Sequence, residues 1–418
     1  MLLLVSGFLR GGWAAWIAHS HPERLRSTDT SSYVEPARAL RDRAQFDQSV
    51  ESHEAEFVRT PGYPAFLAIL SILVGSSETS LAIGQAVLSV AVIWLTFLLG
   101  REVFGGRVGI VAATVVALEP LQFWASGTLL TEMLFSFSLL VVAFVTTRCL
   151  RHHFASARWW ASLGLAIAVA TLFRPTTYYL PVIVVPAIIL FGWRRRIAAK
   201  AIAHAVLAFI VPIVLLIGGW QIRNHERVGS WRYSGVEALS MYLYRAGGLE
   251  ARSEGRSFIE VREERKVAFG PQRDGESQGA YYDRMYDEGI AQVRNDLKGD
   301  AVVAAKGLVS EISGVASTVF PYIGIRESPI LLLAARISAL TAWLVAVAGC
   351  WLGLRNRRTR GPTVAMLTIT LFVLGISAGP EAYSRFRAPV TPFLCILCAS
   401  AIVFLYERHL GLHTDSDA

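Results

Sequence analysis

The residues of this chain that could do chemistry are two carboxylates and a group of arginines in the polar segments between long apolar runs. Asp29 follows the first apolar run, and Glu132 stands at the start of a later one. Arg174, Arg385 and Arg387 occupy similar borders further along. An arginine fork matches the geometry of a phosphate, and a carboxylate can take up a proton. Together these residue types favour a site for a phosphate-bearing substrate next to a general base.

Each of these residues also has an ordinary explanation. Glu132 suits the N-terminus of a helix, and Asp29 could cap one. Arg174 could extend to the membrane interface, and Arg385 and Arg387 could meet lipid headgroups. Chemistry is favoured because the whole set is expected at one face of a membrane, where ionisable groups are costly.

The first polar stretch, residues 27–64, contains further candidates. Asp29 and Tyr33 are four residues apart, so they share a face if this segment is helical. The run Pro61-Gly62-Tyr63-Pro64 predicts a turn in which Gly62 can take a positive φ.

The composition indicates an all-α integral membrane protein. Of 418 residues, 53% are hydrophobic and only 17% are charged, with a mean hydropathy of +0.44. Soluble domains have about 25% charged residues. The net charge of +8 does not indicate a nucleic-acid partner, because the basic residues form short clusters between apolar runs. The sequence has no Walker motif and no glycine-rich dinucleotide fingerprint.

The four cysteines lie in or beside apolar runs, and the pair Cys395-x-x-Cys398 has no second pair to complete a metal site. We therefore expect packing thiols and no disulfide framework.

Ten apolar segments have the length needed to cross a bilayer. They are about residues 2–18, 79–99, 108–123, 131–147, 159–173, 176–191, 201–220, 330–354, 363–378 and 390–406. Residues 64–75 are also apolar, but a crossing of ~30 Å needs ~20 residues. We expect this segment to lie in the interface or to re-enter it.

Among the short loops between these spans, the clusters of basic residues lie on one side. They are Arg101, Arg107, Arg148, Arg151, Arg158, Arg194, Arg195, Arg196, Lys200, Arg355, Arg357, Arg358 and Arg360. The positive-inside rule assigns this side, and both termini, to the cytoplasm. Residues 1–418 are then a single membrane domain, with outer loops at 19–78 and 221–329. The longer loop is expected to contain an amphipathic helix, from Tyr282 to Leu297, that could lie on the membrane.

Six short motifs follow one another on the predicted outer side. They are Asp29-Thr-Ser-Ser-Tyr33, Arg59-Thr-Pro-Gly-Tyr-Pro64, Leu-Leu-Thr-Glu132, Phe173-Arg174-Pro175-Thr176, Gly219-Trp220-Gln-Ile-Arg223-Asn224 and Arg385-Phe-Arg387-x-Pro389. Their order resembles the GT-C glycosyltransferases, specifically the bacterial branch related to protein O-mannosyltransferases and the lipid A aminoarabinose transferase. The resemblance spans nearly the whole chain.

This resemblance implies an enzyme of the bacterial inner membrane that moves a sugar, hexosyl or pentosyl, from a polyprenyl-phosphate donor with inversion. The acceptor is an envelope glycan, lipid or protein on the periplasmic face. Asp29 matches the expected catalytic base, and Glu132 matches a second acid that orients the acceptor or binds metal. The resemblance allows one cofactor, a divalent metal such as Mg²⁺ or Mn²⁺, with these two acids as candidate ligands. The implied substrate-binding residues are Tyr33, Arg59, Tyr63, Arg174, Arg223, Asn224, Arg385 and Arg387.

The sequence departs from the family pattern at two points. Asp29 is not followed by Glu, as it is in the protein mannosyltransferases, which puts a protein acceptor in doubt. Pro36 is expected to interrupt the helix after Tyr33 or to begin it.

Two other classes remain as alternatives. An O-antigen polymerase or ligase also has outer-face arginines, but it lacks the early Asp29 loop followed by Pro-Gly-Tyr-Pro. A multi-span transporter would have broken helices at mid-membrane and two matching halves. The clustering of polar residues at one face favours the transferase.

Overall fold

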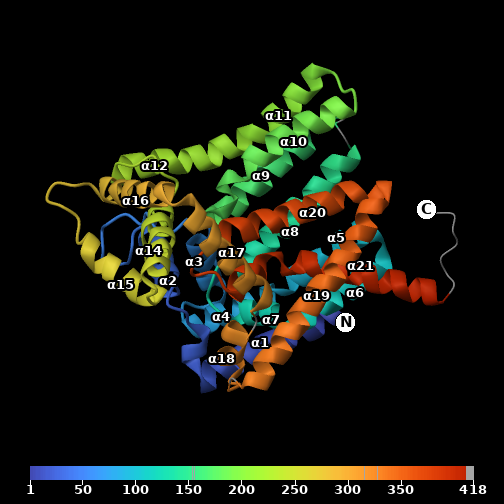
Figure 1. The fold of residues 1–418 in the computed structure, drawn as a ribbon, viewed down its shortest axis with the longest axis horizontal. Helices are drawn as coiled ribbons and strands as arrows, with labels where there is room; N and C mark the ends of the chain where they lie inside the picture. The colour runs from blue at the N-terminus through green and yellow to red at the C-terminus, as the bar shows by residue number, and fades with distance from the viewer. Residues whose placement is uncertain (153, 155, 315, 327, 411–418) are drawn as a thin grey trace.

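The computed structural model describes residues 1–152, 154, 156–314, 316–326 and 328–410, and these are predominantly helical (Figure 1). Within these ranges the only extended pairing is a single bridge between Asp47 and Ala55, so the all-α prediction is confirmed.

The helices of the first half are α1 (Leu2–Ser20), η1 (Pro22–Leu25), α2 (Ser31–Arg43), α3 (Gly62–Val74), α4 (Glu78–Leu88), α5 (Val90–Phe104), α6 (Gly106–Leu118), α7 (Pro120–Gly127), α8 (Glu132–His152), α9 (Ala157–Phe173), η2 (Pro175–Tyr179), α10 (Leu180–Arg194) and α11 (Ala199–Ile213). Those of the second half are η3 (Val214–Gly218), α12 (Gly219–Val228), α13 (Val236–Leu239), η4 (Ser240–Ala246), α14 (Gly247–Glu254), α15 (Phe258–Phe269), α16 (Gln278–Asn295), α17 (Leu297–Ser313), α18 (Ala316–Ile323), α19 (Pro329–Arg355), α20 (Arg357–Ser377), η5 (Ser384–Val390) and α21 (Thr391–His409).

Seven helical segments in the described residues are long and apolar enough to cross a membrane. An eighth is the pair α6 and α7, which bends by 61° where Glu119 separates the two helices. The two remaining predicted spans correspond to α1 and α9, both of which form as helices. The interfacial segment corresponds to α3, whose 13 residues are too few to cross ~30 Å.

The spans pack around α21, which begins directly after the Arg385–Arg387 segment. In the most apolar part of the segment Ser384–His409, which comprises η5 and α21, 78% of residues are buried, whereas in α19 only 11% are. Close approach of the helices depends on glycines. A Cβ at Gly349 of α19 would lie 1.8 Å from the Leu397 carbonyl oxygen of α21. Small residues let membrane helices approach backbone to backbone, since lipid supplies no hydrophobic driving force between them.

Two local expectations about the first outer loop are wrong. Helix α2 begins at Ser31 and continues through Pro36, and its N-cap is Thr30, not Asp29. Gly62 does not take a positive φ; it is the first residue of α3. Its small size is needed because a Cβ there would lie 2.5 Å from the Leu172 carbonyl oxygen near the end of α9.

The long loop folds into helices α13 to α17 beside α12, and α12, α14, α15 and α16 gather at one end of the view in Figure 1. Helix α16 matches the expected amphipathic helix, but it ends at Asn295, and Leu297 begins α17. Its apolar face does not lie free for lipid, because Met285 packs against Tyr242 and Leu243. The protein itself covers this surface.

The cysteines are all free, and Cys149, Cys395 and Cys398 are buried, as expected for packing thiols.

Candidate active site

Arg385 joins the two predicted acids. From η5, its Nη1 lies 3.0 Å from Asp29 Oδ2, and its Nε donates a hydrogen bond of 2.5 Å to Glu132 Oε1. The three residues come from distant parts of the chain. The start of α2, the start of α8 and the approach to α21 therefore meet at one point.

Arg59 holds the other side of Asp29. Its Nη2 donates to Asp29 Oδ1 at 2.9 Å, and its Nη1 donates to the Tyr33 hydroxyl at 3.2 Å. Its Nε donates to Ser32 Oγ at 2.9 Å, and the guanidinium lies 4.6 Å from the centre of the Tyr33 ring. Arg59 thus joins Asp29 to Tyr33, although Asp29 precedes α2 and the two residues do not share a helical face.

Glu132 is fully buried at the first residue of α8. Its Oε1 lies 3.6 Å from Arg174 Nη1, while its Oε2 has no hydrogen-bond partner among the described residues. The Arg174 guanidinium also lies 5.2 Å from the ring of Phe386, the residue between Arg385 and Arg387 in the sequence. Arg174 is therefore part of the same cluster.

Exposure separates the residues that a substrate could reach from those that support them. The side chain of Asp29 is 32% exposed, and those of Arg59 and Arg174 are 20% and 16% exposed. Glu132 is 0% exposed and Arg385 only 8%. In this arrangement Asp29 is open to solvent, whereas Glu132 is enclosed and contacts Arg385 and Arg174.

The Asp29 carboxylate is kept ionised by its neighbours. Burial alone would raise its pKa, but the positive charges of Arg385 and Arg59 outweigh burial and hold the pKa below its usual value. An ionised carboxylate at neutral pH is the form that can accept a proton.

Tyr63 supports the cluster from behind. It is buried, and its ring packs edge-on against Tyr33 with centroids 5.2 Å apart. Its hydroxyl donates to Gln85 Oε1 at 2.7 Å, and Gln85 Nε2 donates to the Thr128 carbonyl at 2.7 Å.

Arg223 and Asn224 do not join the cluster. Arg223 donates to the carbonyls of Glu56 at 2.8 Å and Phe46 at 2.7 Å. Asn224 Nδ2 donates to the Tyr233 carbonyl at 2.9 Å. Arg223 thus holds the backbone at Glu56, whose carboxylate accepts from the Arg59 backbone N–H. Asn224 holds the segment next to Ser234, whose hydroxyl donates to the Val58 carbonyl.

Arg387 points toward the end of α17, where its Nη1 donates to the carbonyls of Glu311 at 3.2 Å and Ile312 at 2.5 Å. A cation at a helix C-terminus is favourable, so Arg387 has a structural role independent of substrate.

Sequence reasoning missed Glu311. This residue is fully buried, and both of its carboxyl oxygens lack a hydrogen-bond partner among the described residues. Burial raises its pKa to about 8, although the charges of Arg174 and Arg387 act in the opposite direction. A signal was present, because the buried face of α17 repeats every four residues. Its members are Gly299, Val303, Gly307 and Glu311.

The side chains of this cluster do not fit a divalent metal ion. Within the described ranges no three His, Cys, Asp or Glu side chains group together. Both candidate ligands, Asp29 and Glu132, contact Arg385 instead. Mg²⁺ prefers six oxygens, and the two carboxylates are already compensated by Arg385 together with Arg59 and Arg174.

Comparison with known proteins supports the fold and part of the family assignment. Residues 58–220 match the family model of dolichyl-phosphate-mannose-protein mannosyltransferases. No curated protein sequence matches significantly.

Two solved structures of the archaeal oligosaccharyltransferase of Archaeoglobus fulgidus share the fold. AglB in complex with an inhibitory peptide and a dolichol-phosphate has a TM-score of 0.59 at 14% identity, over 98% of this chain and 51% of that chain. The complex of the same enzyme with Zn and sulfate has a TM-score of 0.57 at 16% identity, and the match covers 98% of this chain and 49% of that chain. ArnT from Cupriavidus metallidurans bound to undecaprenyl phosphate is 17% identical, with a TM-score of 0.40. The match covers 96% of this chain and 76% of that chain.

This chain therefore has the GT-C fold, which confirms the resemblance of its motifs at the level of the fold. It spans about half the length of the oligosaccharyltransferase structures that it matches.

Proposed function

We propose that this chain is a membrane glycosyltransferase that moves a sugar from a polyprenyl-phosphate donor to an acceptor hydroxyl on the periplasmic face. The observation that carries the proposal is the partly exposed Asp29 carboxylate, held ionised between Arg59 and Arg385. A lipid-phosphate donor is supported by the matching family, which is named for dolichyl-phosphate-mannose, and by the dolichol-phosphate bound to AglB.

In this reaction Asp29 is the general base. Its carboxylate takes the proton from the acceptor hydroxyl as that oxygen attacks C1 of the donor sugar. The bond between C1 and the phosphate oxygen breaks on the opposite side, so one displacement inverts C1. One carboxylate is enough, in contrast to the two that a retaining glycosidase uses.

The arginines stabilise the departing phosphate. Polyprenyl phosphate leaves as an anion and needs no general acid. Arg385, Arg174 and Arg59 converge within contact of the two acids, and preformed positive charge of this kind lowers the barrier as charge develops on the phosphate oxygen. Glu132 is then a positioning residue that fixes Arg385 and Arg174.

The test is Asp29→Asn, assayed by transfer of radiolabel from polyprenyl-phosphate sugars in membranes. The amide keeps the shape of the side chain but cannot accept the proton, so we expect turnover to fall by about 10²–10⁴-fold while donor binding remains. The matched control is Asp42→Asn near the end of α2, where the carboxylate pairs with its neighbour Arg41.

Near-normal turnover in well-folded Asp29→Asn membranes would contradict the proposal and leave Asp29 a structural ion-pair partner. Identification of the labelled product would also reveal the acceptor.

A further inference from the structure

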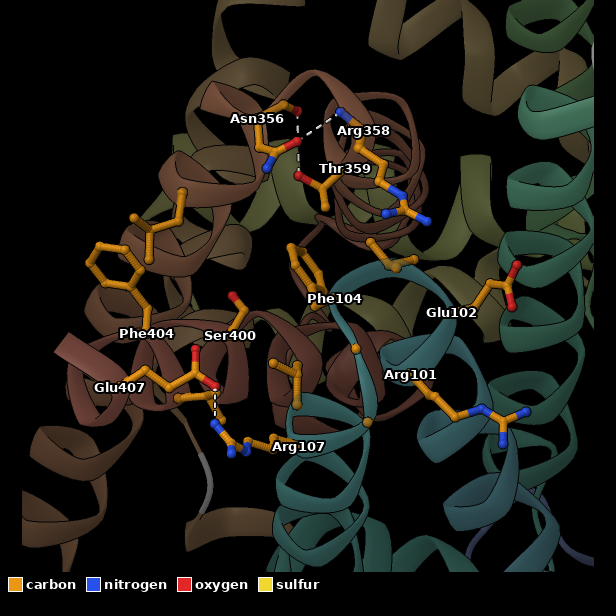
Figure 2. A pocket seen from close by; sticks show the side chains of 16 residues that line it. Arg101, Glu102, Phe104, Arg107, Asn356, Arg358, Thr359, Ser400, Phe404 and Glu407 are labelled. Carbon is orange, nitrogen blue, oxygen red and sulfur yellow. Dashed lines mark hydrogen bonds and ion pairs between the residues drawn. The ribbon is translucent and has the colours of Figure 1, made fainter. Parts of the chain in front are cut away.

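A second polar site lies at the opposite end of the spans. A cavity of about 560 Å³ opens between the α5–α6 turn, the α19–α20 turn and the end of α21 (Figure 2). Its lining residue Glu102 accepts a hydrogen bond of 2.5 Å from Arg151, near the C-terminal end of α8. Glu132 begins the same helix of 21 residues, so the cavity lies about 30 Å from the candidate active site.

The lining of this cavity has uncompensated positive charge. Arg107 is paired with Glu407 at 2.7 Å, as Figure 2 shows, and Glu102 is neutralised by arginines of α8. Arg101 and Arg358 also line the cavity, and neither forms an ion pair with any other residue in the described ranges. These two guanidinium groups therefore have no carboxylate partner in the described ranges, and Arg101 also lies 5.2 Å from the centre of the Phe97 ring.

Two helix starts add to the attraction for an anion. The first turn of α6 and the first turn of α20 both line the cavity. The partial positive charge of a helix N-terminus favours phosphate. Asn356 caps α20 by accepting the Arg358 backbone N–H at 2.8 Å.

The same cavity has an apolar wall. Phe104, Leu352 and Val403 line it together with the arginines. A Cβ built on Gly106, at the rim, meets no atom within 4 Å, so this side of the cavity is open. A volume of this size lies within the ~300–1,000 Å³ typical of small-molecule sites.

We propose that this cavity binds the phosphate headgroup of an acidic membrane lipid at the end of the spans that the arginine distribution assigns to the cytoplasm. The free guanidinium groups and helix starts would hold the phosphate, and the apolar wall would contact the first part of the acyl chains. Basic pockets between membrane helices recognise acidic lipids in this way. The inference is independent of the proposed transferase reaction.

The simpler alternative is that these arginines only set the orientation of the protein in the membrane. That role requires positive charge but no binding pocket. A matched pair of double variants separates the two. Arg101→Gln with Arg358→Gln removes the free charges that line the cavity. Arg355→Gln with Arg360→Gln removes the same charge from the α19–α20 border, outside the lining.

The measurement is thermal unfolding of the purified full-length protein in detergent, with added phosphatidylglycerol, phosphatidylcholine or inorganic phosphate. We expect phosphatidylglycerol to raise Tm by several degrees, and this shift to be lost in the cavity variant and kept in the control variant. Gly106→Leu, which leaves every arginine in place, should also weaken the shift by filling the open side.

Three results would overturn the proposal. One is no shift with phosphatidylglycerol in the wild type. Another is an equal loss in both double variants, which would mean that net charge alone attracts the lipid. The third is a full shift with inorganic phosphate, which would identify a soluble anion as the ligand.

Discussion

At the scale of single residues, the proposed site depends on the fork of Arg385. Its Nη1 and Nε serve two different carboxylates from two positions on one rigid plane, whereas a lysine ammonium has all its donors on a single nitrogen. We expect Arg385→Lys to lower kcat/KM by about 10–100-fold and to raise the apparent KM for the donor, because a charge-assisted hydrogen bond contributes about 1.5–3 kcal/mol.

Arg387→Lys is the natural comparison. Arg387 donates to backbone carbonyls at the end of α17, which a lysine can also reach, so its KM should change less. Donor binding that is normal in both lysine variants would remove these two arginines from the donor site.

The sequence predicted that motifs expected at one membrane face lie together, and Arg385 does contact Asp29. Local spacing predicted less, because Asp29 precedes α2 and is joined to Tyr33 through Arg59. Glu311 was missed because its partners, Arg174 and Arg387, are distant in the chain and its burial depends on tertiary packing. The position of Arg223 follows from the path of the loop before Arg59, which no local pattern specifies.

At the scale of elements, the contact between α3 and α9 positions the first outer loop next to Arg174. We expect Gly62→Ala to destabilise the protein by about 1–3 kcal/mol, because the new Cβ would lie 2.5 Å from the Leu172 carbonyl oxygen. Thermal unfolding in detergent measures this.

Gly12→Ala is the control, since a Cβ there meets no atom within 4 Å and alanine favours a helix. Equal melting temperatures for the two variants would show that α3 moves away from α9 without cost.

Helix α17 should make stability depend on pH through Glu311. Because burial raises its pKa to about 8 from 4.5, the folded protein prefers the neutral carboxyl. The contribution of Glu311 to the free energy of unfolding is therefore complete below about pH 4.5. It is lost as the pH rises through about 8, and the loss amounts to up to about 5 kcal/mol. Arg174 and Arg387 are the charged groups that face it.

In the Glu311→Gln variant this side chain is uncharged at every pH, so its pH-dependent contribution to stability should disappear. We expect the difference in Tm between the wild type and Glu311→Gln to change between pH 5 and pH 9. A constant difference across that range would mean that the carboxyl is solvated and titrates normally.

The element scale also shows where sequence patterns mislead. Pro36 indicated a break, yet α2 continues through it. The apolar stripe of α16 predicted a membrane surface, but a stripe of this kind fits any apolar partner, and here the partner is the protein around Tyr242.

At the scale of the whole molecule, the two polar sites lie at opposite ends of the spans, which fixes what labelling should show. We expect Ser253→Cys, exposed on α14, to react with an impermeant maleimide in intact cells. Arg360→Cys, exposed near the start of α20, should react only after permeabilisation. The wild-type chain, whose cysteines lie within helices, is the control. The reverse pattern would invert the orientation and exchange the faces of the two sites.

The ion pairs of Asp29 with Arg59 and Arg385 have a kinetic consequence in the proposed reaction. A carboxylate whose pKa is lowered by Arg385 and Arg59 has little affinity for the acceptor's proton. An incoming donor phosphate competes for the same guanidinium groups, and as they turn toward it the proton affinity of Asp29 rises. The donor then switches on the base that the second substrate needs. The enzyme should therefore bind its substrates in a compulsory order, with the lipid-linked sugar first and the acceptor second.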